Sequence, residues 1–180
     1  MPLAPGRYSI GPDAGHVHVR TTREGVVARA GHDLLIAFAR WTGTITIDRD
    51  GTGAVEAEVE TASFEVVAGS GGVVPLTAVD KSVITTTARR LLDVDRHARA
   101  TFAATRIVQR DGGHIDGTLT LRGRSAPLTI EVAEAGPTEW RGTATVLQSA
   151  FGITPYRGLF GALRVADPVG VEIAVDLSLT

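Results

Sequence analysis

The sequence predicts an all-β domain with one helix. Apolar and polar residues alternate with a period of two in several segments, turn-forming residues separate these segments, and a single run has helical spacing. Such alternation gives each strand one dry face and one polar face, as in antiparallel sheets. About eight to ten short strands follow from it. Many short strands with one helix are typical of a sandwich or a closed barrel, and alternation alone does not choose between them.

Length and composition agree with one globular domain over residues 1–180. The net charge is −2, and Lys81 is the only lysine among scattered arginines, which gives no case for a nucleic-acid partner. The absence of cysteine excludes disulfides and thiolate metal sites. Residues 1–15 have no secretory signal pattern and no segment is apolar over the length of a membrane span, so we expect a cytoplasmic protein.

The clearest strand is the C-terminal one. Valine, isoleucine and leucine occupy every second position of residues 169–179, and the same alternation marks residues 55–60, 115–121 and 128–132. Turns are predicted between strands, at residues 48–53, 111–113, 136–137 and 167–168.

Residues 77–92 are predicted to form the helix. Thr77 and Asp80 have the spacing of a capping box, and Arg89 and Arg90 suit a helix C-terminus. The β-branched run 84–87 counts against a helix, but the segment is too long for an average strand. Its apolar face comprises Val79, Val83, Ile84, Ala88 and Leu91.

Several segments along nearly the whole chain are characteristic when taken in order. They are residues 6–10 (GRYSI), 30–34 (AGHDL), 41–45 (WTGTI), 91–97 with Thr101-Phe102, 116–123 (DGTLTLRG) and 149–153 (SAFGI). Together they resemble the YceI-like family. The resemblance implies an antiparallel lipocalin-like β-barrel that binds a polyisoprenoid or another amphiphilic lipid in an internal apolar cavity. This chain departs from the family at His97-Ala98, where a proline is usual, and at Gln148, where an arginine is common.

The cavity that the resemblance implies is supported by side-chain size. Aromatic residues make up only 5% of the chain, and small residues such as Ala57, Ala104 and Gly117 are predicted to point inward and leave volume unfilled. The candidate ligand-binding residues lie on apolar strand faces, in apolar motifs or at the barrel mouth. They are His32, Leu34, Ile36, Phe38, Phe102, Leu119, Leu121, Ile130, Phe151, Tyr156, Phe160 and Ile173.

Other residues leave alternatives open. His16 and His18 share a strand face and have a spacing that suits a metal, but a third ligand is not evident, so we interpret them as solvent-facing and expect no metal or other cofactor. His32 is expected to make a structural hydrogen bond at the barrel mouth or to contact a ligand head group. Residues 152–161, with Tyr156 and Phe160, suit either a lid over the cavity or a plug at the barrel end.

The sequence therefore predicts a non-catalytic protein that binds, transports or sequesters an isoprenoid or fatty lipid, with a homodimer as one possible assembly. One alternative is a small barrel enzyme that acts on a lipid-like substrate with His32 as acid/base. Another is a filled barrel that serves as an interaction module.

Overall fold

The computed structural model describes residues 3–108 and 113–179, and it consists almost entirely of antiparallel strands. One α-helix, α1 (Ala78–Leu92), and five short 3-10 turns complete the described part of the chain. The strands are β1 (Gly6–Ile10), β2 (Gly15–Thr21), β3 (Arg23–Glu24), β4 (Asp33–Phe38), β5 (Trp41–Ile47), β6 (Gly53–Glu60), β7 (Phe64–Ser70), β8 (Arg99–Val108), β9 (Gly113–Leu121), β10 (Arg124–Glu134), β11 (Glu139–Leu147), β12 (Arg157–Gly158), β13 (Leu163–Val165) and β14 (Pro168–Asp176).

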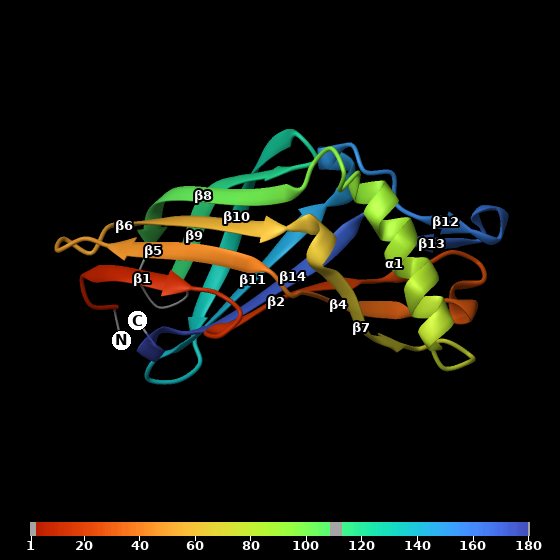
Figure 1. Cartoon of the computed structure of the whole chain (residues 1–180), viewed down its shortest axis with the longest axis horizontal. Coiled ribbons are helices and arrows are strands. Elements are labelled where there is room, and N and C mark those ends of the chain that lie inside the picture. Colours follow the sequence, from red (N-terminus) through yellow and green to blue (C-terminus); the bar gives the residue numbers. More distant parts are fainter. Residues whose placement is uncertain (1–2, 109–112, 180) are drawn as a thin grey trace.

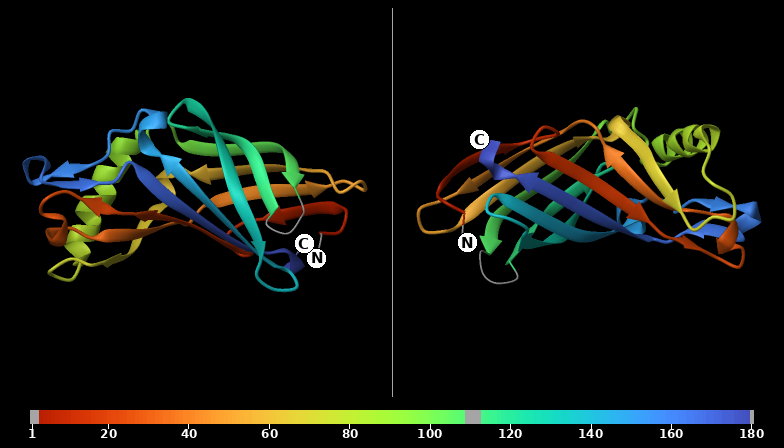
Figure 2. Two further views of the ribbon diagram at one scale, coloured as in Figure 1. Left: turned by 180° about the vertical axis from the view of Figure 1, so that it is seen from behind. Right: turned by 90° about the horizontal axis from the view of Figure 1, so that it is seen from below.

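Eleven of the described strands form one curled sheet in the order β1-β5-β6-β8-β9-β10-β11-β14-β2-β4-β7 (Figure 1). The chain runs from β4 directly into β5, and from β6 through a 3-10 turn into β7. Backbone bonds hold this double bend, with Ala39 N donating to Ser63 O at 3.1 Å and Glu60 N donating to Arg40 O at 3.0 Å. β4 and β7 lie at one end of the strand order, and β5 and β6 lie near the other end. The two bends therefore connect the two ends of the sheet. The sheet curls into the barrel that the sequence predicted, as the views in Figure 2 show.

Helix α1 lies across one end of the barrel, whereas β1 and the end of β14 lie at the opposite end (Figures 1 and 2). Its capping box is present as predicted, because the Thr77 side chain accepts from Asp80 N and the Asp80 carboxylate accepts from Thr77 N. Ile84, Ala88 and Leu92 pack against a cluster formed with β4 and β7. The predicted apolar face is only partly correct, since Val79 and Val83 are exposed.

The half of the barrel away from α1 is filled by side chains. Phe102 packs there with Val55, Ala104 and Ile130. Gly117 allows this packing, because a Cβ at that position would lie 2.4 Å from the Phe102 ring. The space beside Gly117, which was predicted to be unfilled, therefore holds the Phe102 ring, and Ala104 is buried in the same cluster.

The remaining sequence predictions agree with the structure in most details. The turns at 48–53, 136–137 and 167–168 fall between strands or at a strand start, and the turn at 111–113 lies mostly outside the described residues. The strand count is higher than predicted, because three short strands form a second sheet, in the order β12-β13-β3, and because bends divide two long strands into β4 and β5 and into β6 and β7. The last strand ends at Asp176, and Leu177–Leu179 form a 3-10 turn.

Candidate functional site

A cavity of about 810 Å³ lies between α1 and the inner faces of β2, β4, β9 and β14. Its size is within the range of small-molecule sites. Most of the side chains that line it are aliphatic or aromatic. The apolar lining residues include Val17, Val19, Leu34, Ile36, Phe38, Phe64, Leu76, Val83, Ile84, Ala88, Leu91, Leu92, Leu119, Leu121, Val146, Ile153, Leu163, Val169 and Val171.

The same strands line the cavity at one end and fill the core at the other. In β14, Val169 and Val171 line the cavity, whereas Ile173 and Val175, on the same face, pack in the core. In β9, Leu119 and Leu121 line the cavity and Ile115 packs against Phe102 and its neighbours. The cavity is therefore the half of the barrel interior that lies under α1.

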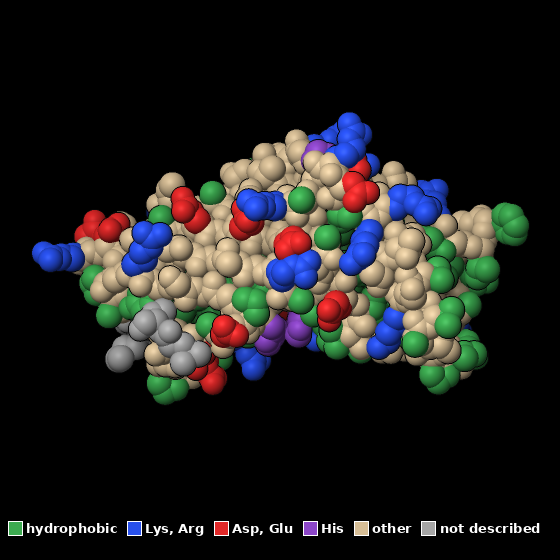
Figure 3. Space-filling view, in the orientation of Figure 1, with side chains coloured by type: hydrophobic (Ala, Val, Ile, Leu, Met, Phe, Trp, Pro, Cys, Tyr) green, Lys and Arg blue, Asp and Glu red, His purple; other side chains and the backbone are tan. Residues whose placement is uncertain are grey.

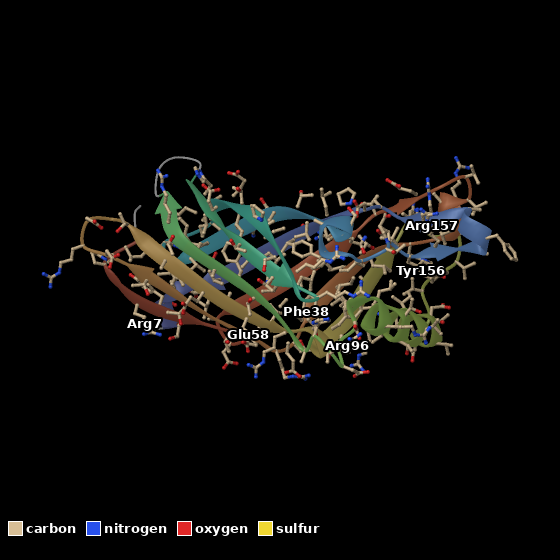
Figure 4. All side chains as sticks on the ribbon, turned by 90° about the horizontal axis from the view of Figure 1, so that it is seen from above. Arg7, Phe38, Glu58, Arg96, Tyr156 and Arg157 are labelled. Atoms are coloured by element: carbon tan, nitrogen blue, oxygen red, sulfur yellow. The ribbon has the colours of Figure 1, made fainter. Side chains whose placement is uncertain are left out.

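The cavity opens to solvent beside α1. Val73, Val74, Val83 and Tyr156 both line it and are exposed, so they mark its mouth. In Figure 4, Phe38 lies towards the middle of the barrel and Tyr156 towards the α1 end. The ring Nε2 of His32 hydrogen-bonds to Val74 O at 2.8 Å and so attaches the segment before α1 to the barrel.

Protein groups already hold several polar side chains around the cavity. Arg23 donates to Ser70 O at 2.7 Å and lies 3.4 Å from the Asp33 carboxylate. Gln148 donates to Ala166 O at 2.8 Å. Asp80 is bonded by the Thr77 hydroxyl and by Thr77 N–H, which hold the pKa of its carboxyl below the usual range and keep it ionised. The Arg164 guanidinium, by contrast, makes no hydrogen bond or ion pair within residues 3–108 and 113–179.

The structure brings seven of the predicted site residues together. His32, Leu34, Ile36, Phe38, Leu119, Leu121 and Tyr156 all line the cavity. Four others lie inside the barrel without lining it. They are Phe102, Ile130 and Ile173, in or against the core of the filled half, and Phe151, which packs with Val146 and Ile153. Phe160, in the 3-10 turn Leu159–Gly161, is fully exposed. The part that each plays in ligand binding stays a prediction.

The lining also includes residues that the sequence prediction missed. Val17 and Val19 of β2 and Val169 and Val171 of β14 lie on inward faces, which the alternation did indicate. The helix residues Ile84, Ala88 and Leu91 were placed on one face, but nothing in their spacing shows that this face meets a cavity and not a packed core.

His16 and His18 share the outer face of β2, as predicted, and their rings stack with centroids 4.2 Å apart. Burial, with a further contribution from His16, lowers the pKa of His18 below its ordinary value. Across the described ranges, no group of three or more His, Asp or Glu side chains has an arrangement that would hold a metal ion. None of the helices in these ranges is long and apolar enough to cross a membrane.

Comparison with known proteins supports the fold. BcnA from Burkholderia cenocepacia superposes with a TM-score of 0.60 at 16% identity, covering 88% of this chain and 94% of BcnA. The YceI protein of Campylobacter jejuni superposes with a TM-score of 0.58 at 14% identity, covering 78% of this chain and 82% of that protein. No curated protein matches the chain in sequence. The model of the YceI-like domain matches residues 8–178. With this match over nearly all of its length, the chain belongs to the YceI-like family.

Proposed function

We propose that this protein binds a long apolar or amphiphilic lipid, such as a polyisoprenoid, in the cavity under α1 and so transports or sequesters it. The observation that carries the proposal is the cavity itself, about 810 Å³ with a mostly apolar lining and an opening beside the helix. Leu34, Ile36, Phe38, Leu119 and Leu121 are the side chains that we expect to contact the chain of the lipid.

Apolar burial supplies the affinity in this proposal. Each methylene that leaves water contributes about 0.8 kcal/mol before the costs of association are subtracted. An apolar cavity of this size that stayed empty would also leave its lining without contacts on one side, so a bound chain adds stability to the fold. These terms favour any chain of suitable length and do not by themselves select one lipid.

Selectivity for a head group would come from the mouth. The side chains of His32, Arg23 and Asp80 are hydrogen-bonded to protein atoms. The side chains of Arg164 and the exposed Tyr156 also lie at the cavity but make no hydrogen bond or ion pair in the described chain. A guanidinium at the mouth favours an anionic or strongly hydrogen-bonding head group over an uncharged one. We therefore expect Arg164 and Tyr156 to lie closest to the polar end of the ligand.

A cavity-filling substitution tests the proposal. Ala88→Trp places a large ring in the cavity, so it should abolish uptake of a fluorescent fatty acid. Thr86→Trp is the matched control on the exposed side of the same helix and should bind like the wild type. Equal binding by both variants would contradict the proposal. Native mass spectrometry and organic extraction of the purified protein would then identify the natural ligand, and a lipid changed chemically by the wild type would indicate an enzyme instead.

A further inference from the structure

Apolar side chains gather on the surface at the end of the molecule that carries the cavity. Figure 3 shows them around α1 and the adjoining loops, whereas charged side chains spread over the rest of that face. We call six of them the apolar rim: Val26, Val27, Val73, Val74, Leu159 and Phe160. Phe160 has a relative exposure of 113% and Val26 one of 92%, so nothing in the described chain covers them.

The apolar rim comes from three loops that are tied to one another. Val27 N donates to Ala162 O at 3.2 Å, which joins the first loop to the loop that holds Leu159 and Phe160. His32 bonds to Val74 O at 2.8 Å, which joins the segment 73–76 to the barrel beside the first loop. Val73 and Val74 also line the cavity. The apolar rim therefore adjoins the cavity mouth.

Positive charge accompanies the apolar rim. Residues 22–31 and 154–165 make up two of its loops together with β3, β12 and β13. They hold four arginines and one glutamate, although the whole chain has a net charge of −2. Arg23 is paired with Asp33. Arg29, Arg157 and Arg164 are exposed and make no side-chain hydrogen bond or ion pair in the described ranges. These three guanidiniums are available to an anionic partner.

We propose that the apolar rim docks on the surface of a phospholipid bilayer that contains anionic lipids, with the cavity mouth turned towards the membrane. This inference rests on the proposed function, since it makes the membrane the place where the lipid chain enters or leaves the cavity. Arginines beside exposed apolar side chains match the two layers of a membrane surface, in which phosphates lie above the acyl chains.

The shape of the apolar rim favours a bilayer over a folded protein partner. Its side chains come from three separate loops, two from each. Leu159 and Phe160 both have positive φ values, 49° and 54°, which non-glycine residues seldom adopt, and both side chains are exposed. A fluid bilayer accepts such separate side chains without a complementary surface, whereas a protein interface needs close packing.

Vesicle binding tests the proposal directly. The wild type should sediment with vesicles of phosphatidylcholine and phosphatidylglycerol, and the double variant Leu159→Ser, Phe160→Ser should bind at least about tenfold more weakly. Arg157→Glu should weaken binding to these vesicles. Arg7→Glu is its matched control, because Arg7 is exposed at the opposite end of the molecule (Figure 4), and should bind like the wild type.

Depth of insertion gives a second readout. Phe160→Trp should be quenched by spin-labelled acyl chains in the vesicles. The native Trp41 and Trp140 pack together with Tyr8 and Val175 in the filled half of the barrel, so the wild type should show no quenching. Quenching of the wild type to the same extent as Phe160→Trp would overturn the proposed orientation.

Three further results would overturn the proposal. The first is undiminished vesicle binding by the double variant, and the second is an equal loss of vesicle binding in Arg7→Glu and Arg157→Glu. The third is a wild type that does not bind vesicles but forms a concentration-dependent dimer that the double variant abolishes, which would assign the apolar rim to a second copy of the chain. The proposed function fails separately. If the wild type takes up no fluorescent fatty acid in vesicle-free solution but binds vesicles through the apolar rim, lipid binding in the cavity is refuted and docking stands.

Discussion

Two phenylalanines provide a matched test of where the barrel is packed and where it is hollow. Phe102 is 8% exposed, packs with Val55, Ala104 and Ile130, and lies directly over Gly117. Phe38 lines the cavity, and its ring meets the edge of the Phe64 ring with centroids 5.9 Å apart. The same change, Phe→Ala, thus removes a ring with neighbours on all sides in one case and a ring open to the cavity in the other.

The expected magnitudes differ accordingly. Phe102→Ala should lower the free energy of unfolding by about 3–5 kcal/mol, the cost of a full cavity in a packed core. For a chain of 180 residues this corresponds to a loss of about 6–20 °C in Tm. Phe38→Ala should cost less than about 3 kcal/mol, because one side of the ring already lacks protein neighbours. It should, however, reduce affinity for a fluorescent fatty acid, which Phe102→Ala should leave unchanged.

Urea unfolding and a fatty-acid titration on the same two variants measure both quantities. The reasoning would be refuted if Phe102→Ala weakened ligand binding as much as Phe38→Ala did while it cost little stability. That result would mean that the ligand space reaches into the half of the barrel that we describe as filled.

Two further predictions concern histidines. His32→Ala removes the hydrogen bond to Val74 O, so it should speed hydrogen exchange in residues 73–76. It should also lower ligand affinity by about 0.5–1.5 kcal/mol, the usual net contribution of one such hydrogen bond. Unchanged exchange in this segment would show that the bond does not hold the loop. The pKa of His18 is lowered in the folded protein from its ordinary value of 6.5, so below pH 6.5 the unfolded chain binds more protons at this residue than the folded chain. Stability should therefore fall as the pH drops through 6.5 towards the folded pKa. His18→Gln should lessen this loss in urea unfolding between neutral and mildly acidic pH, and an unchanged pH profile would show that His18 does not cause it.

The sequence was sufficient to predict the kind of structure but not the location of the cavity. The alternation in residues 169–175 correctly indicated an inward face, yet Val171 lines the cavity and Val175 packs in the core with the same residue type and the same parity. The capping box at Thr77 fixed the start of α1, because that signal is local. What α1 covers depends on how the sheet curls, which no local pattern encodes.

The location of Phe160 shows the other limit. Phe160 was expected at the ligand, because its glycine-rich segment suited a lid over the cavity. The backbone is left-handed at Leu159 and Phe160, and the Phe160 ring is exposed to solvent. Gly117 shows the reverse, since its lack of a side chain predicted empty space and the Phe102 ring fills it. The backbone conformation of the residue itself decides the first case, and the packing of a residue distant in sequence decides the second.

The pairing of β2 with β14 has a consequence for how the chain folds. This ladder joins segments about 150 residues apart, as the Arg20–Glu172 ion pair with a sequence separation of 152 illustrates. Closing this long loop costs conformational entropy before the contact contributes any favourable free energy. Hairpins such as β9–β10, by contrast, form from segments adjacent in sequence. The β2–β14 ladder should therefore be among the last to form, and until then the lining of the future cavity is open to water and to other unfolded chains.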